Sequence, residues 1–157
     1  MNTLDPRVIV VWRLTGLLTA AFLTAVVAAI EYWVLARWGA SFITPGLPSG
    51  LVALLVLSLS FTWPPLHYRF WRWDVQSDRV LIQKGVVWRS RSVIPRVRVQ
   101  HVDTRTSPMQ RWFGLSSLII YTAGTRGADA EIPGLASEEA EALREELARL
   151  EELDERA

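Results

Sequence analysis

The chain has 157 residues, of which 50% are hydrophobic, a formal net charge of +1 and no cysteine. The lack of cysteine excludes structural disulfides and thiolate metal sites. The charges are unevenly spread, because residues 69–111 hold ten basic side chains against three acids, whereas residues 112–157 hold eleven acids against four arginines. The middle of the chain is therefore basic, and the C-terminal part is acidic.

Two long apolar stretches precede the charged part of the chain. Residues 14–30 are 17 consecutive uncharged residues, and residues 38–66 are 29. A helix needs about 20 mostly apolar residues to cross the hydrocarbon core of a bilayer. We therefore expect transmembrane helices at about 12–36 and 48–65, the second of them ended by Pro64 and Pro65, because proline lacks a backbone donor. Glu31 falls near the far end of the first helix, where a carboxylate can reach the interface.

Aromatic residues gather at the ends of these two stretches. Amphipathic rings prefer the headgroup level of a bilayer, so the cluster indicates an aromatic belt. For Trp71 and Trp73, packing in the core of the first strand is an equal alternative. The cluster comprises Trp12, Trp33, Trp38, Trp63, Tyr68, Trp71 and Trp73.

The arginines predict how the chain is oriented in the membrane. Two arginines precede the first span and two follow the second, whereas the intervening loop carries only Arg37, balanced by Glu31. The positive-inside rule then places both termini of a multi-pass protein in the cytoplasm. Residues 14–30 could instead be a cleaved signal peptide with a small-residue site at 27–29. In that case the second span still leaves the following domain cytoplasmic.

Residues 68–157 are expected to form one cytoplasmic domain after a membrane region at 1–67. Period-two alternation predicts strands at 70–76, 79–84, 86–94, 97–104, 117–122 and 130–132, with a helical turn at 107–114. Gly124 and Gly127 frame a hairpin turn. Ser137 can cap a final helix with glutamates in its first turn and Ala140, Leu143, Leu147 and Leu150 on one face. The pattern predicts a small curved antiparallel sheet, or partial barrel, covered by an amphipathic helix.

Three short motifs carry a resemblance to a known family. They are IPRVRVQHV at 94–102, QRWFGL at 110–115 and TAG at 122–124. Their order and spacing resemble the bacterial pleckstrin-homology-like, membrane-flanked (YdbS-like) family, and the two preceding spans match as well. The resemblance covers essentially the whole chain. It implies a pleckstrin-homology-like sheet capped by a helix, and it suggests self-association or a complex with a larger multi-repeat relative.

The inventory of reactive side chains is poor. His67 and His101 stand 34 positions apart with no carboxylate at ligand spacing, so His101 is expected to be a partly buried sheet residue. Asp78 and Asp103 fit turn capping at strand ends. The Gly124–Gly127 turn is not followed by a helix, as a phosphate-binding loop requires. We therefore expect no enzymatic activity, no cofactor and no metal.

The basic strands suggest two binding functions. In the first, Arg89 and Arg91 share one face of a strand, Arg96 and Arg98 share a face of the next, and this face docks on anionic lipid. The competing interpretation is that these arginines only keep an exposed sheet soluble and blunt its edges.

The second function, which we favour, is protein binding and assembly. The acidic helix and the basic strands are complementary surfaces that could meet within one chain or between chains. Nucleic acid is not an expected partner, because the acidic tail opposes it and no recognised motif occurs. The candidate residues for a lipid or a protein partner are Arg89, Arg91, Arg96, Arg98, Arg111 and Trp112.

Overall fold

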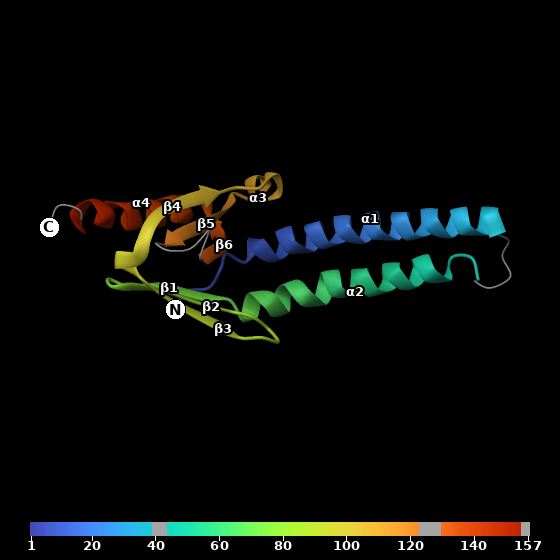
Figure 1. Ribbon diagram of the computed structural model, residues 1–157, viewed down its shortest axis with the longest axis horizontal. Coiled ribbons are helices and arrows are strands. Elements are labelled where there is room, and N and C mark those ends of the chain that lie inside the picture. Colours follow the sequence, from blue (N-terminus) through green and yellow to red (C-terminus); the bar gives the residue numbers. More distant parts are fainter. Residues whose placement is uncertain (39–43, 123–129, 155–157) are drawn as a thin grey trace. The chain divides into compact units, whose positions relative to one another are not determined.

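The computed structural model describes residues 1–38, 44–122 and 130–154, and the chain divides into two compact units. One unit, Trp12–Pro65, is helical, and the other combines Met1–Val11 with Leu66–Ala157 and holds both sheets (Figure 1). The later boundary lies within two residues of the expected one at 67. The earlier boundary differs, because the first eleven residues, expected in the membrane region, belong with the sheets.

The helical unit is built from α1 (Arg7–Trp38) and α2 (Leu47–Arg69), each long and apolar enough to cross a bilayer. Both extend beyond the stretches expected from sequence. The expectation that Pro64 and Pro65 end the second helix is wrong, because α2 continues through them to Arg69. A proline removes one backbone donor, but its fixed φ is close to the helical value, so a helix can continue through it at a cost.

Small residues bring α1 and α2 together inside this unit. A Cβ atom added to Gly16 would lie 2.7 Å from Ser60 Oγ, so the two helices approach closely there. Ala20 and Ser60 are both buried. Small side chains allow helix backbones to pack by van der Waals contact where lipid provides no hydrophobic driving force.

The first sheet has the order β1 (Arg72–Val75), β2 (Arg79–Lys84) and β3 (Ser90–Pro95), all antiparallel. Strand β2 has the bounds expected from sequence, whereas β3 begins four residues later than expected. Gly85 causes the difference, because it adopts a φ of +111° and a Cβ there would lie 1.8 Å from the carbonyl oxygen of Trp88. The chain therefore makes a tight loop through residues 86–89 before β3.

The second sheet has the order β4 (Val99–Arg105), β5 (Leu115–Thr122) and β6 (Ala130–Ala136). Strand β5 is central, and its first six residues are buried. A 3-10 turn, η1 (Arg96–Arg98), separates β3 from β4. Strand β6 is longer than expected, because Gly134 accommodates a φ of +62° within it. The hairpin predicted at Gly124 and Gly127 lies outside the described residues.

Two helices accompany the second sheet. Short α3 (Pro108–Trp112) precedes β5, and α4 (Ser137–Asp154) lies along β4, β5 and β6 (Figure 1). Ala140 and Leu147 are buried and Leu143 is partly buried, as the apolar face of this helix predicted. Burying that face holds α4 on the sheet.

The N-terminal segment (Met1–Val11) completes the core of the sheet-containing unit. Leu4, Val8 and Val11 are buried, and the backbone of Asn2 pairs with that of Trp73, with N–O distances of 2.6 and 3.1 Å. The amide of Asp5 also donates to the Gly134 carbonyl oxygen at 3.0 Å. The first residues of the chain thus bind strands from both sheets.

Replacing Gly134 with alanine should detach this segment. The new Cβ would lie 2.3 Å from Val8 Cγ2, at a backbone conformation that side-chain-bearing residues rarely adopt. Strain and overpacking together should lower the free energy of unfolding by about 2 kcal/mol or more. Chemical unfolding of the full chain in detergent, followed by tryptophan fluorescence, measures this loss.

The matched control is Gly50→Ala in α2, where no atom lies within 4 Å of the added Cβ and φ is ordinary. Alanine is the better helix former, so this variant should match or exceed the stability of the parent protein. Equal stability of the Gly134 variant and the parent would contradict the proposed contact.

Candidate functional site

The structure separates the four arginines expected on one basic sheet. Arg96 and Arg98 lie in the 3-10 turn η1 rather than in a strand. In a 3-10 helix it is residues i and i+3 that align, so these two arginines do not share a face as predicted. The Arg96 side chain is only 11% exposed, and its Nη2 lies 2.9 Å from Glu146 Oε1. Arg96 therefore serves a contact within the chain.

The other two arginines also differ from each other in setting. Arg89 lies in the loop before β3, with its guanidinium carbon 5.4 Å from the centre of the Phe70 ring. Arg91 lies in β3 opposite Gln83 and is exposed, as is Arg98. The predicted continuous basic face is thus divided between a loop, an edge strand and a turn.

The acidic helix meets the basic part of the sheet within the same chain. Besides the ion pair of Arg96 with Glu146, the hydroxyl of Thr104 donates to Glu141 Oε2 at 3.1 Å. Glu146 is 55% exposed, and exposed ion pairs contribute about 0–1 kcal/mol. The sequence left open whether these surfaces meet within a chain or between chains, and the structure shows an intrachain contact.

Helix α3 carries Arg111 and Trp112, and hydrogen bonds fix its N-terminal end. Ser107 Oγ accepts from the Gln110 amide at 3.2 Å while Gln110 Oε1 accepts from the Ser107 amide at 2.9 Å, which is a capping box. The Gln110 amide side chain also donates to Ser117 Oγ at 3.1 Å. Trp112 is 83% exposed, and Arg111 is exposed too.

A second exposed tryptophan was missed by the sequence analysis. Trp88 is 89% exposed in the loop after Gly85, next to exposed Val87. Because residues 86–94 were predicted to form one strand, the sequence analysis did not predict this loop. The available signal was Gly85 followed by two valines and a tryptophan, with Lys84 and Arg89 on either side. Such a run suits an exposed loop at a bilayer surface as well as it suits a strand.

The other two tryptophans of this unit are core residues. Trp71 and Trp73 are buried, and Trp73 Nε1 donates to the Thr3 carbonyl oxygen at 3.3 Å. Trp71 Nε1 donates to His67 Nε2 at 3.1 Å. Of the two interpretations left open by sequence, core packing is the one that the structure shows.

The reactive side chains do not converge. His101 is more exposed than predicted, at 57%, and stacks on Tyr121 with ring centres 4.1 Å apart. Asp78 lies in the β1–β2 turn, as expected, and its pKa is held below its usual value by a hydrogen bond from Arg79. Over residues 1–38, 44–122 and 130–154, no three side chains of the histidine, aspartate or glutamate type gather to bind a metal ion.

Two apolar helices and a unit of two antiparallel sheets with a C-terminal helix define a pleckstrin-homology-like protein with membrane helices. The family model described as "Bacterial PH domain" matches residues 8–151. The chain belongs to this family. The match begins inside the N-terminal segment, in agreement with the placement of that segment in the core of the sheet-containing unit.

Similarity to a curated protein supports a membrane location. The chain is 30% identical over 158 residues to "UPF0699 transmembrane protein YdbS" of Bacillus subtilis (strain 168), covering 95% of this chain and 91% of the relative. No solved structure matches the chain significantly. The name of the relative and the two apolar helices agree that the protein is membrane-associated.

The stability of the sheet-containing unit should depend on pH through Asp5. Arg7 donates from Nη2 to Asp5 Oδ2 at 2.8 Å and from Nη1 to the Phe113 carbonyl oxygen at 3.0 Å. The hydrogen bond from Arg7 lowers the pKa of Asp5, so the carboxylate stabilises the fold above its unfolded pKa of about 3.9 and stops doing so as the pH falls through the lowered value.

Asp5→Asn should therefore lower stability at pH 7 by about 1 kcal/mol or less and make no difference in strong acid. Unfolding measured across the acid range checks both parts. Glu131→Gln is the control, because Glu131 is an exposed carboxylate on β6 and its loss should change little at any pH. A pH-independent effect of the Asp5 change would show that the ion pair is not responsible.

Proposed function

We propose that the protein is a non-enzymatic, membrane-anchored module for protein binding and assembly. Its partner is a second copy of this chain or a multi-repeat relative of the same family. The proposed location is the bacterial cytoplasmic membrane with both termini in the cytoplasm, which rests on the distribution of arginines around the two helices. The observation that carries the proposal is the open edge of β3 and the exposed valines beside it.

Strand β3 pairs with β2 along one edge, and within the described parts of the chain no strand pairs along its other edge. An open strand edge presents backbone donors and acceptors to which another chain can add a strand. Val93 of β3 is 49% exposed, and Val97 in the following turn is 80% exposed. These valines offer apolar contact beside the backbone pairing.

Charge supports a partner from the same family. Arg91 and Arg98 are exposed near this edge, whereas Glu138 and Glu145 are exposed on α4. A second copy therefore offers acidic side chains to a basic edge, which favours encounter in a defined orientation. Arg91 and Pro95 also limit unspecific pairing of this edge, since charge and proline discourage strand addition by unrelated chains.

The absence of enzymatic activity remains part of the proposal. It is supported by the separation of the two histidines, since His67 lies in α2 and His101 on the exposed face of β4. General acid–base chemistry needs such groups within hydrogen-bond reach of one substrate. Binding through a surface needs no such arrangement.

The double change Val93→Asp and Val97→Asp tests the proposal. Two carboxylates at this edge should exclude a partner strand, because burying an unpaired charge is costly. We expect the parent protein, taken from native membranes in mild detergent, to run as a complex larger than one chain. The double variant should shift to the single-chain mass and lose its co-purified protein, as measured by light scattering and mass spectrometry.

The control is Ser77→Asp, which adds a carboxylate at an exposed position in the β1–β2 turn. This variant should keep the complex. The proposal is wrong if the parent protein is monomeric and retains no protein, or if the double variant keeps the same complex as the parent.

A further inference from the structure

We infer that the sheet-containing unit docks on the lipid leaflet from which its own helices emerge, through two exposed tryptophans. The docking surface, here termed the tryptophan rim, uses other side chains than the β3 edge that follows it in the chain, and it goes beyond the proposed function. Its occupant is the headgroup layer of a bilayer that contains anionic lipid. The tryptophan rim consists of Lys84, Val87, Trp88, Arg89, Arg111 and Trp112.

The position of the rim relative to the bilayer follows from the two points at which the chain leaves and re-enters the sheet-containing unit. The chain leaves after Val11, inside α1, and returns at Leu66, inside α2. A helix rises about 1.5 Å per residue, so Arg7 lies about 6 Å before the first crossing and Arg69 about 5 Å after the second. Groups that touch the chain close to these positions are therefore kept near the surface of the bilayer.

The first loop of the rim lies beside the second crossing. Phe70 and Trp71 directly follow α2, and each contacts a basic side chain at one end of the β2–β3 connection. The Arg89 guanidinium carbon is 5.4 Å from the Phe70 ring centre, and Lys84 Nζ is 5.8 Å from the Trp71 ring centre. Through these contacts, the loop that carries Trp88 lies against the residues that directly follow α2.

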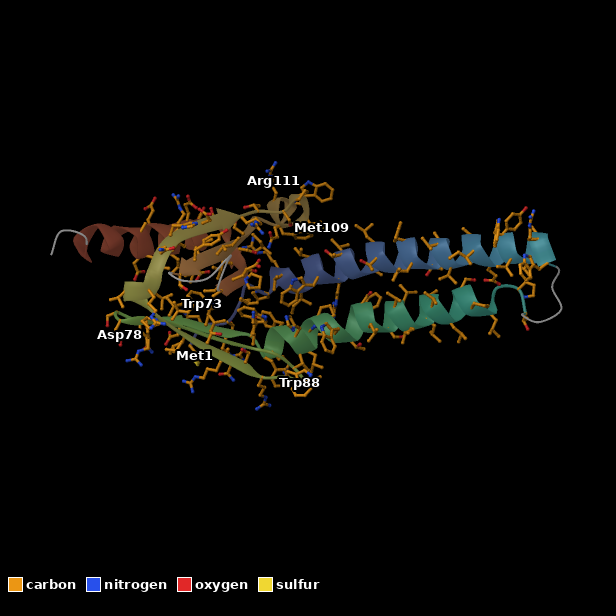
Figure 2. All side chains as sticks on the ribbon, in the orientation of Figure 1. Met1, Trp73, Asp78, Trp88, Met109 and Arg111 are labelled. Carbon is orange, nitrogen blue, oxygen red and sulfur yellow. The ribbon has the colours of Figure 1, made fainter. Side chains whose placement is uncertain are left out.

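The second part of the rim lies beside the first crossing. Arg7 opens α1, and its guanidinium donates to the carbonyl oxygen of Phe113, the residue after Trp112. Figure 2 shows Trp88, Met109 and Arg111 at the end of the sheet-containing unit that is opposite Asp78. Both exposed tryptophans therefore lie at the end of the unit where the chain enters the bilayer.

The side chains of the rim have the chemistry of a bilayer interface. Tryptophan prefers the headgroup layer, where its ring is apolar and its N–H can donate. Lysine and arginine beside it are attracted to anionic lipid. Because the membrane helices hold the leaflet at high effective concentration, even weak contacts suffice for docking. A soluble protein has no such advantage at this surface, which favours lipid as the occupant.

Spin labels on the full chain can test this inference, because the sequence has no native cysteine. Single cysteines are introduced at Val87 or Arg111 on the rim, and at Ser77 in the β1–β2 turn as the matched control. Each protein is placed, one chain per disc, in nanodiscs of phosphatidylcholine with a minority of phosphatidylglycerol. Collision rates of each label with oxygen, which enters lipid, and with a water-soluble nickel chelate are then measured.

The rim labels should collide severalfold less with the nickel chelate, and more with oxygen, than the label at Ser77. Low collision rates with both reagents indicate cover by protein rather than lipid and overturn the inference. Rates equal to those at Ser77 also overturn it, since they describe a loop surrounded by water.

A second variant separates docking from assembly. Changing Trp88 and Trp112 to serine should raise nickel access at Val87 severalfold while leaving the mass of the detergent-extracted complex unchanged. Val97→Ser, which removes an exposed apolar side chain outside the rim, should leave nickel access unchanged. The inference fails if the serine pair does not alter access at Val87, whatever the outcome for the β3 edge.

Discussion

The contact of Val8 with Gly134 is the constraint on which the sheet-containing unit depends. It joins the eighth residue of the chain to the last strand, and the pairing of Asn2 with Trp73 joins the same segment to the first strand. Leu4 and Val11 fill the core between these contacts. A cleaved signal peptide ending near residue 29 would remove all of these groups from the sheet-containing unit.

The N-terminal segment also helps to position the proposed docking surface. Arg7 links it to the end of α3, and thereby fixes the base from which Trp112 projects. Gly85 fixes the loop that carries Trp88, because only a residue without a Cβ fits next to the carbonyl oxygen of Trp88. The open edge of β3 begins directly after this loop. Backbone features thus place the two proposed surfaces, one for lipid and one for protein, a few residues apart.

The sequence predicted the architecture better than the details of the surface. The length of the uncharged stretches located the two apolar helices, and periodicity located strand β2 and the buried face of α4, because each of these elements has one dominant pattern. It could not show that Arg96 turns toward Glu146, since that contact joins residues fifty positions apart. The strand predicted at 86–94 was too long because alternation continues through Val86 and Trp88, although Gly85 forces a loop. The core position of the N-terminal segment had no local signal, because its partners are distant in sequence.

Membership of residues 1–11 and 66–157 in one folded unit has a topological consequence. The proposed placement of both termini on one face of the membrane agrees with this unit, because a bilayer cannot divide a compact unit. The intervening residues must then cross an even number of times, which the two apolar helices satisfy as a hairpin. This parity follows from the packing of Leu4 and Val8 alone, without reference to charge. The segment that is synthesised first therefore meets its partner, Gly134 of β6, only after both apolar helices have been synthesised.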